Sequence, residues 1–251
     1  VKDEHSVLGT RYSLLKSNYR EHNSILMALK SCPRVPPAQA SNFLPLTAAL
    51  YEPLWRKRSL SIITLGEFTV ERELELMLEW LNLQPNQVVL DAACSAGLYA
   101  RTLLKHDSSL SVHAVDFSLP FLKKAKNYAE RDNVSPIFLQ ADVSNLPYKN
   151  QVFDAVVCGG SLNEFLDVPK VMREFARVLK PGGKMWQMYL KRSEEPVGKT
   201  FQGLLRLSGI RFIDPKMFEK QCNEVGLNFV KAQHRGRVVM ALFEKRVPSS
   251  E

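Results

Sequence analysis

Apolar residues change their spacing in a regular way along the central part of the chain. Between positions 70 and 81 they recur every three or four residues, which predicts an amphipathic helix that ends before Pro85. The same spacing returns at 168–179, where Asp167 and a proline stand near the start. Strands that alternate with helices predict a parallel sheet with right-handed crossovers. Short, continuously apolar runs typical of strands buried on both faces lie at 88–90, 111–115, 136–139 and 155–158.

The C-terminal part of the chain predicts a different strand pairing. Residues 215–225 have helical spacing, and two strand-like runs follow at 227–232 and 237–243. Because the turn Arg235-Gly236 separates these runs, we expect them to form an antiparallel pair. The whole order predicts an α/β fold with a mostly parallel sheet.

The first 69 residues lack this regularity. A polar stretch at 12–29 is expected to be helical, and the breaker-rich segment 32–37 follows it. We therefore expect residues 1–69 to form an N-terminal helical extension and residues 70–247 to form the main domain.

Composition limits the choice of partner. The chain has 251 residues, 45% of them hydrophobic, which is enough for one core and an extension. Its formal net charge is +8, but the basic residues are dispersed and are not interleaved with aromatic side chains as a base-stacking surface requires. The charge pattern therefore does not favour a nucleic-acid partner.

Cysteines and apolar runs bear on the compartment. Cys32, Cys94, Cys158 and Cys222 are scattered and form no CxxC pair, so they indicate neither a metal site nor a disulfide framework. No run reaches the roughly eighteen apolar residues of a membrane-spanning helix. We expect no transmembrane segment and a cytoplasmic location, or an organelle stroma if a targeting segment has been removed ahead of Val1.

One loop carries the candidate chemistry. An apolar strand begins at Val88 and ends in Asp91. A loop of small residues follows and leads into a helix near Leu98. In a doubly wound sheet, ligands bind at the carboxyl ends of such strands, and small side chains let a ligand approach the backbone. The amides at the start of the helix, near Gly97, can bind an anionic group such as a carboxylate. The same pattern also occurs where a strand and a helix merely pack tightly.

A second acid strengthens the case for a nucleoside ligand. The next strand ends in Asp116, 19 residues after Gly97, which is the spacing at which an acid binds the two ribose hydroxyls of a nucleoside. The alternative role for Asp116 is to cap the helix at 118–131, which Ser118 can do equally well.

These motifs resemble, in their order, those of the class I S-adenosylmethionine-dependent methyltransferases, in particular the branch that contains ubiquinone and menaquinone biosynthesis methyltransferases. The resemblance covers about residues 70–245 and implies a Rossmann-like, doubly wound sheet of seven strands. It implies S-adenosyl-L-methionine as the cofactor and the C- or O-methylation of a small, apolar or aromatic acceptor. The motifs that carry it are Asp91 to Gly97, Asp116, Gln140-Ala141-Asp142, Phe153 to Val157 and Leu179 to Gly183.

The resemblance assigns the first loop to the methionine part of the cofactor. It implies that Asp91 lies near the amino group, that Ala93, Ser95 and Gly97 run along the methionine, and that Asp116 binds the ribose.

The remaining cofactor contacts follow from the later strands. The resemblance places Phe117 on the adenine and Asp142 near its exocyclic amine, with the backbones of Ala141 and Val143 beside it. It places Gly159 close to the sulfonium, where a small residue lets the backbone approach the reacting centre.

The chain departs from the family pattern in two places. The family loop reads G-x-G-x-G, whereas this chain has Ala93, Ser95 and Gly97. Alanine and serine fit there if φ is negative, and the Ser95 hydroxyl then has the chance to bind the cofactor carboxylate. This departure keeps open a catalytically silent relative that only binds the cofactor. The family histidine after the fourth strand is also absent, since Ser161-Leu162-Asn163-Glu164 stands there.

Methyl transfer from a sulfonium needs mainly positioning and the exclusion of water. A base is required only for an acceptor that keeps its proton at neutral pH. By position, Glu164 is the candidate for proton removal and Asn163 for acceptor orientation; a capping or surface role at a helix start is the alternative for both.

The N-terminal extension is expected to act as a lid. It contains Phe43, Tyr51 and Trp55, and Tyr51 is a third candidate catalytic residue. The alternative is a plain packing helix, because aromatic residues more often fill cores. The segment 192–213, with Phe201, Leu204, Leu205 and Phe212, is expected to form another wall of an apolar pocket.

Two other enzyme classes share parts of the pattern. A nicotinamide oxidoreductase shares the strand, turn and ribose acid, but the YxxxK pair Tyr12 and Lys16 precedes the loop, whereas the dehydrogenase pair follows it. A nucleic-acid amino-methyltransferase carries an Asn/Asp-Pro-Pro-aromatic motif after the fourth strand, where this chain has Cys158-Gly159-Gly160-Ser161.

Overall fold

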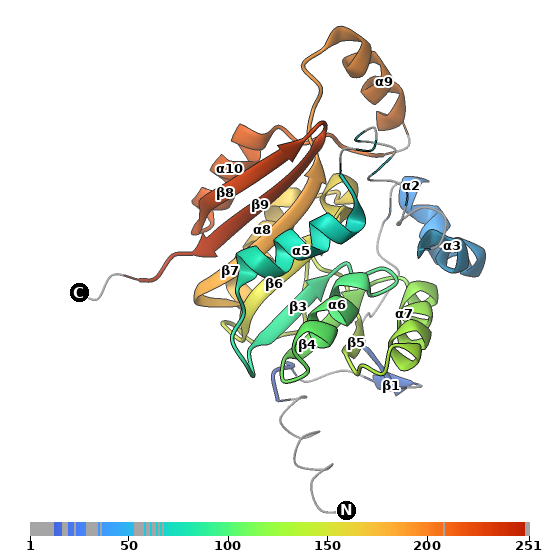
Figure 1. Ribbon diagram of the computed structural model, residues 1–251, viewed down its shortest axis with the longest axis vertical. Helices are drawn as coiled ribbons and strands as arrows, with labels where there is room; N and C mark the ends of the chain where they lie inside the picture. The colour runs from blue at the N-terminus through green and yellow to red at the C-terminus, as the bar shows by residue number, and fades with distance from the viewer. Residues whose placement is uncertain are drawn as a thin grey trace, which may run out of the picture.

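The structure is a computed structural model that describes residues 13–16, 20–22, 24–28, 35, 37–52, 58, 61, 64, 66, 68–207 and 209–248. One sheet runs through this part of the chain (Figure 1). Its nine strands lie in the order β1-β2-β5-β4-β3-β6-β7-β9-β8. Their bounds are β1 Arg20–His22, β2 Ile25–Met27, β3 Val88–Ala92, β4 Ser111–Asp116, β5 Ile137–Gln140, β6 Phe153–Gly159, β7 Leu179–Leu190, β8 Leu227–Arg235 and β9 Val238–Lys245.

The centre of the sheet is parallel. β3 pairs with β4 and β6, β4 also pairs with β5, and β6 also pairs with β7, all in parallel. β9 lies between β7 and β8 and is antiparallel to both, which confirms the expected antiparallel pair at the C-terminus. The predicted Rossmann-like sheet of seven strands is therefore formed by the neighbours β5-β4-β3-β6-β7-β9-β8.

Helices cover both faces of this sheet, as a doubly wound fold requires (Figure 1). α5, α6 and α7 pack on one face, and α8 and α10 pack on the other. The helical segments are α2 Pro37–Ala40, η1 Ser41–Phe43, α3 Pro45–Leu50, α5 Val70–Leu81, α6 Leu98–His106, α7 Leu119–Arg131, η3 Ser161–Glu164, α8 Val168–Val178, α9 Pro196–Arg206 and α10 Pro215–Glu224.

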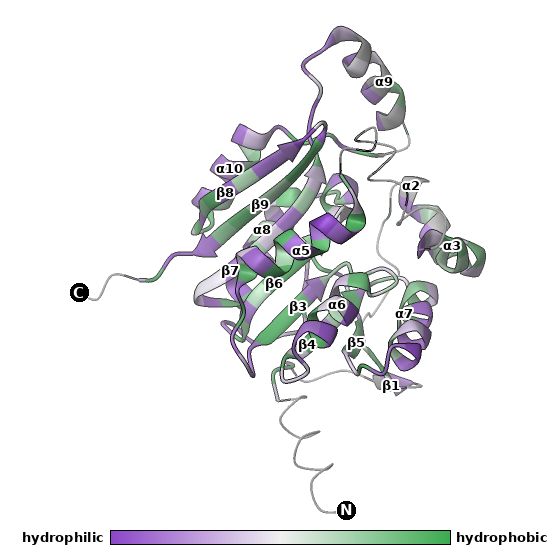
Figure 2. Ribbon diagram, in the orientation of Figure 1, coloured by the Kyte–Doolittle hydropathy of each residue, from purple (hydrophilic) through white to green (hydrophobic). Residues whose placement is uncertain are grey.

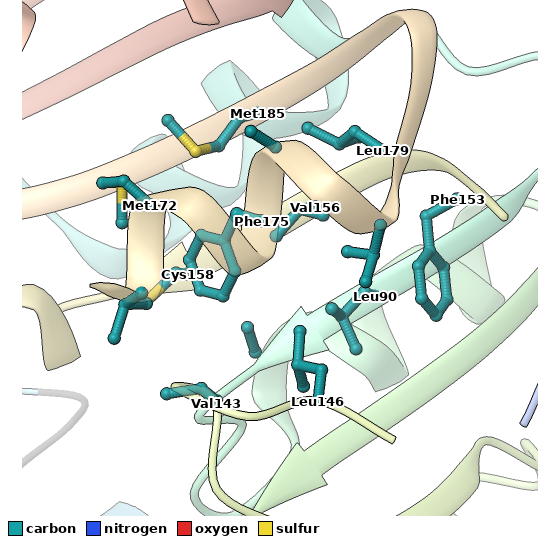
Figure 3. Packing of buried hydrophobic residues seen from close by; sticks show 14 of the residues in the cluster. Leu90, Val143, Leu146, Phe153, Val156, Cys158, Met172, Phe175, Leu179 and Met185 are labelled. Atoms are coloured by element: carbon teal, nitrogen blue, oxygen red, sulfur yellow. The ribbon is translucent and has the colours of Figure 1, made fainter. Parts of the chain in front are cut away.

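Each face has its own buried core. Figure 3 shows Met172 and Phe175 of α8 against Val156 and Cys158 of β6, with Leu90 of β3 beside them. The opposite face buries the apolar side of α5, α6 and α7. Figure 2 shows β3 and β9 as largely hydrophobic, and the edge strand β8 and the outer sides of α5 and α7 as hydrophilic, which is the pattern of a sheet buried between two helical layers.

Local signals set the helix boundaries. Thr69 caps α5 by accepting a hydrogen bond from the Arg72 amide at 3.3 Å, and Asn82 ends the helix in a left-handed conformation with φ 43°. Asp167 caps α8 in the same way, accepting from the Lys170 amide at 2.9 Å. The predicted helix at 70–81 is thus confirmed.

The prediction of a helix at 12–29 is wrong for the residues that the structure describes there. Residues 20–22 and 25–27 form β1 and β2, joined by a turn in which Ser24 has φ 59°. β2 pairs in parallel with β5, which would otherwise be the open edge of the sheet. This extra pair also explains why nine strands are seen where seven were expected.

Candidate active site

A cavity of about 470 Å³ opens at the carboxyl ends of the parallel strands. Its volume is in the range of small-molecule sites. A narrow second pocket continues from it beneath the loop after β3, and Tyr51, Ala93, Ser95 and Gly159 line both. The two spaces therefore form one connected site at the edge where ligands bind in doubly wound folds.

The loop after β3 has a left-handed backbone at three alternate residues. Ala93, Ser95 and Gly97 have φ of 56°, 48° and 73°. The condition of negative φ set for Ala93 and Ser95 is therefore not met. A left-handed conformation costs a residue with a Cβ about 1–2 kcal/mol, and such strain is typical of functional sites.

Hydrogen bonds from neighbouring strands hold this loop in place. The amide of Cys94 donates to the Val115 carbonyl at 2.9 Å, and the amide of Ser95 donates to Oδ2 of Asp116 at 2.9 Å. Asp91 accepts from the Ala100 amide of α6 at 3.0 Å. Since β4 and α6 fix both ends of the loop, its strained conformation is determined by tertiary contacts.

Asp116 is a buried carboxylate at the wall of the cavity. Besides the Ser95 amide, it accepts a hydrogen bond from the Ser118 amide at 2.8 Å. Burial raises the pKa of Asp116 to about 6, although these hydrogen bonds act to lower it. The cap of α7 is Ser118, whose hydroxyl accepts from the Phe121 amide at 3.4 Å, so the alternative role for Asp116 falls to its neighbour.

Both acids lie close enough to Cys94 to act on its thiol. Asp91 lines the narrow pocket and Asp116 lines the main cavity, and both are buried. The pKa of the Cys94 thiol is raised well above its usual value by burial and, in addition, by the negative charges of these two carboxylates. A connected cavity thus runs between two acids at the ends of neighbouring strands.

Three of the residues predicted to contact an adenine line the cavity. Phe117, Asp142 and Val143 line the main cavity. Both carboxylate oxygens of Asp142 accept hydrogen bonds from Ser144, one from its amide at 2.8 Å and one from its hydroxyl at 2.9 Å. Two other predicted contacts, Ala141 and Gly97, are not among the lining residues of either space.

These two residues support the walls from behind. The Ala141 amide donates to the Asp116 carbonyl at 3.1 Å. A Cβ on Gly97 would lie 3.1 Å from the Cβ of Ala125, so glycine allows α6 to begin close to α7.

Gly159 at the end of β6 is required by a buried tyrosine. A Cβ on Gly159 would lie 2.5 Å from the ring of Tyr99. The Tyr99 hydroxyl donates to the Glu73 carboxylate and accepts from Nε1 of Trp186 at 3.4 Å. The backbone of Gly159 therefore lies directly against Tyr99, at the junction of the two spaces.

Glu164 and Asn163 differ in what their side chains do, although both line the cavity. Burial raises the pKa of Glu164, the charge of Asp116 adds to this, and side-chain hydrogen bonds from Gln39 and Asn42 lower it. The amide nitrogen of Asn163 donates to the carbonyls of Leu190 and Arg211, at 2.8 and 2.6 Å, and its oxygen accepts from the Leu190 amide at 2.8 Å. The Asn163 side chain thus joins two chain segments.

The N-terminal segment 37–52 forms one side of the site. The ring of Phe43 lies 5.2 Å from that of Phe117, and the ring of Tyr51 lies 5.2 Å from that of Phe121 in an edge-on arrangement. A buried ion pair joins Glu52 to Arg101 of α6, and the Ser118 hydroxyl donates to the Asn42 carbonyl. Trp55 lies outside the described residues, as does Tyr12.

Sequence reasoning missed the two amides on this segment. Gln39 and Asn42 line the cavity and bind Glu164. In the sequence, the only signal for this pair is their separation by three residues, which places two side chains on the same side of a helix.

The segment 192–213 was expected to form another wall of the pocket. Its Ile210 lines the cavity and its Leu204 is exposed, while the side chains of Phe201 and Leu205 lie outside the described part.

The described residues contain no group of three or more His, Cys, Asp or Glu side chains placed to hold a metal ion. None of their helices combines the length and the apolar character needed to cross a bilayer.

Part of the chain is similar to known methyltransferases. Residues 90–186 match a family described as a methyltransferase domain. A 2-phytyl-1,4-naphtoquinone methyltransferase of Nostoc punctiforme is 31% identical over 145 residues, which cover 57% of this chain and 62% of that protein. A protein of Arabidopsis thaliana named an uncharacterized chloroplastic methyltransferase is 28% identical over 204 residues, which cover 76% of this chain and 56% of that protein. The chain thus spans about three-fifths of the length of these curated relatives.

Solved structures share the fold. A SAM-dependent methyltransferase from Aquifex aeolicus has a TM-score of 0.57 at 17% identity and covers 70% of this chain and 90% of its own. The [4+2]-cyclase SpnF has a TM-score of 0.66 at 16% identity and covers 88% of this chain and 100% of its own. At such identities the likeness concerns the fold alone. Residues 90–186 are thus similar to a methyltransferase domain, and the chain shares its Rossmann-like fold with these solved structures.

Proposed function

We propose that this protein transfers a methyl group from S-adenosyl-L-methionine to a small, apolar or aromatic acceptor, at carbon or oxygen. One observation carries the proposal: the buried Asp116 carboxylate borders a cavity at the carboxyl end of β4, beside a loop with a left-handed backbone. The match to a methyltransferase domain and the relative named a naphtoquinone methyltransferase support the reaction and the acceptor class.

The residues of the site fit the cofactor. The Asp116 carboxylate suits two ribose hydroxyls, and the Asp91 carboxylate at the narrow end suits an ammonium group. Phe117, Asp142 and Val143 offer a flat apolar ring and polar partners for an adenine. Gly159 lines both spaces, so its backbone borders the junction where the cofactor would present its sulfonium.

S-adenosylmethionine, when bound, supplies an electrophilic methyl group on a sulfonium. The protein's own part is to hold an acceptor in line with it and to exclude water. Tyr51 and Phe121 close one side of the cavity, and we propose that the segment 37–52 acts as a lid. Glu164 faces the same space and, because its pKa is raised, is a better proton acceptor for an acidic hydroxyl or carbon. We do not assign acceptor orientation to Asn163, because its side-chain amide is hydrogen-bonded to backbone groups.

A second candidate function is cofactor binding without methyl transfer. The replacement of two loop glycines by Ala93 and Ser95 favours it, and the same fold is found in a protein named a cyclase.

Thermal shift tests the cofactor assignment. At a hundredfold excess over its Kd, S-adenosylmethionine should stabilise the protein by about 2.7 kcal/mol and raise Tm by several degrees, whereas NADH should not. Asp116→Ala should remove most of this shift. Asp107→Ala, a surface acid at the other end of the sheet, is the control and should keep it. A full shift in Asp116→Ala would refute the ribose assignment.

A labelled-methyl assay with reduced naphthoquinones separates transfer from mere binding. Glu164→Gln should lower kcat by about 10²-fold or more while the thermal shift by S-adenosylmethionine is retained. Because the pKa of Glu164 is raised, wild-type kcat at saturating cofactor should fall as the pH is lowered through that pKa, and the variant should lack this fall. A thermal shift without any label transfer would support the silent relative instead.

We also propose a reducing compartment, the cytoplasm or an organelle stroma. Cys94, Cys158 and Cys222 are free and buried, while Cys32 lies outside the described residues. Fractionation with compartment markers tests this location.

A further inference from the structure

A second recess adjoins the candidate active site. It has a volume of about 490 Å³ and lies between the start of α8, residues 209–214 and the start of α10. Leu166 and Ile210 line both this recess and the main cavity. A molecule that fills the cavity can therefore extend past these two side chains into the recess, which we call the arginine groove.

The arginine groove combines positive charge with apolar walls. Arg192, Arg206 and Arg211 line it, are exposed, and form no ion pair with any described residue. The acid among the described lining residues, Asp214, accepts a hydrogen bond from the Met217 amide at 3.1 Å as the cap of α10. Among the described lining residues, three arginines thus stand against one carboxylate, in a recess whose other walls include Leu166, Ile210, Phe212 and Met217.

Charge complementarity indicates the occupant. Guanidinium groups bind carboxylates and phosphates through paired, charge-assisted hydrogen bonds. The groove and the main cavity are recesses that adjoin at Leu166 and Ile210, so a single chain-like molecule can fill both, whereas a flat bilayer surface cannot enter them.

We propose that the acceptor is an anionic amphiphile, whose apolar body passes Leu166 and Ile210 and whose distal carboxylate or phosphate binds in the arginine groove. This inference rests on the proposed function, because it specifies the acceptor of that site. The reacting end lies in the main cavity and the charged end lies between α8 and α10.

Binding of matched ligands tests the proposal. Decanoate, decyl phosphate and decanol have the same chain and differ in charge. Below their micelle-forming concentrations, the two anions should bind wild-type protein at least about tenfold more tightly than the alcohol. The triple variant Arg192→Gln, Arg206→Gln, Arg211→Gln should lose this preference. Arg173→Gln, an exposed arginine of α8 outside the groove, is the matched control and should keep it.

A second variant tests the connection between the two spaces. Ile210→Trp enlarges a side chain shared by both, so it should weaken decanoate binding by about tenfold and leave acetate binding unchanged. Unchanged decanoate binding in Ile210→Trp, or an anion preference retained in the triple variant, would overturn the proposal.

Two controls separate this inference from its alternatives. If the triple variant loses binding to phosphatidylglycerol vesicles but binds soluble decanoate like wild type, the arginines contact a bilayer and the proposal is wrong. The thermal shift by S-adenosylmethionine should be the same in wild type and triple variant. If S-adenosylmethionine does not raise the Tm of the wild-type protein, the proposed function is refuted. If it does raise the Tm but the wild-type protein binds the anions no more tightly than decanol, only the arginine groove is refuted.

Discussion

Two residues of the loop after β3 adopt a backbone conformation that is unfavourable for them. Ala93 and Ser95 have positive φ although each carries a Cβ, while Ala96 between Ser95 and Gly97 does not have a positive φ. The loop keeps this shape because its amides bind the end of β4. The same residues line the cavity, so the strain is located where a ligand must approach the backbone.

Glycine substitution measures this strain. Ala93→Gly and Ser95→Gly should each raise the free energy of unfolding by about 1 kcal/mol, because the cost of the left-handed conformation exceeds the entropy that glycine adds to the unfolded chain. Tm should rise by about 2–4 °C for each. Ala96→Gly is the control in the same loop and should lower the free energy of unfolding. A loss of stability in Ala93→Gly would show that its conformation is not strained. Chemical denaturation of the four proteins provides the measurement.

The N-terminal segment shows how a short element can complete a site. α2, η1 and α3 together contain thirteen residues, and both η1 and α3 contact α7. Phe43 and Tyr51 pack on Phe117 and Phe121, and the Glu52–Arg101 ion pair anchors the end of the described segment. Its position beside the cavity supports the proposed lid.

Removal of one aromatic contact tests the lid. Phe43→Ala should weaken binding of S-adenosylmethionine by several-fold, because the ring that supports Phe117 is lost, and an aromatic pair contributes about 0.5–1.5 kcal/mol. Leu46→Ala is the control on the same segment, since Leu46 is 69% exposed and should leave the affinity unchanged. Equal affinities of wild type and Phe43→Ala in calorimetric titration would contradict the lid.

At the scale of the molecule, the sheet couples the N-terminal residues to both cores. Ile25 and Leu26 of β2 are buried, and because they are neighbours in a strand they point to opposite faces. Ile25 belongs to the core beneath α5, α6 and α7, and Leu26 belongs to the core beneath α8. The segment that was expected to be an extension therefore contributes to the interior of the domain.

Truncation of Ile25 tests this coupling. Ile25→Ala should lower the free energy of unfolding by about 2–4 kcal/mol, and unfolding should remain one transition. Leu46→Ala again serves as the exposed control. If Ile25→Ala instead creates a separate early transition and leaves the main one unchanged, β1 and β2 form an independent unit.

The sequence alone determined the elements whose signals are short-range. Helical spacing was sufficient for α5, apolar runs were sufficient for the parallel strands, and the acids that end β3 and β4 indicated where a nucleoside would bind. The connected cavity borders both acids, in agreement with that expectation.

Other features were decided only by contacts between distant parts of the chain. The strands β1 and β2 form because β5 offers an open edge, which no local pattern reveals. The positive φ of Ala93 and the binding of Glu164 by Gln39 and Asn42 depend on partners far away in sequence. Local propensity and periodicity act over a few residues, whereas edge pairing, backbone strain and side-chain hydrogen bonds depend on which segments the fold brings together.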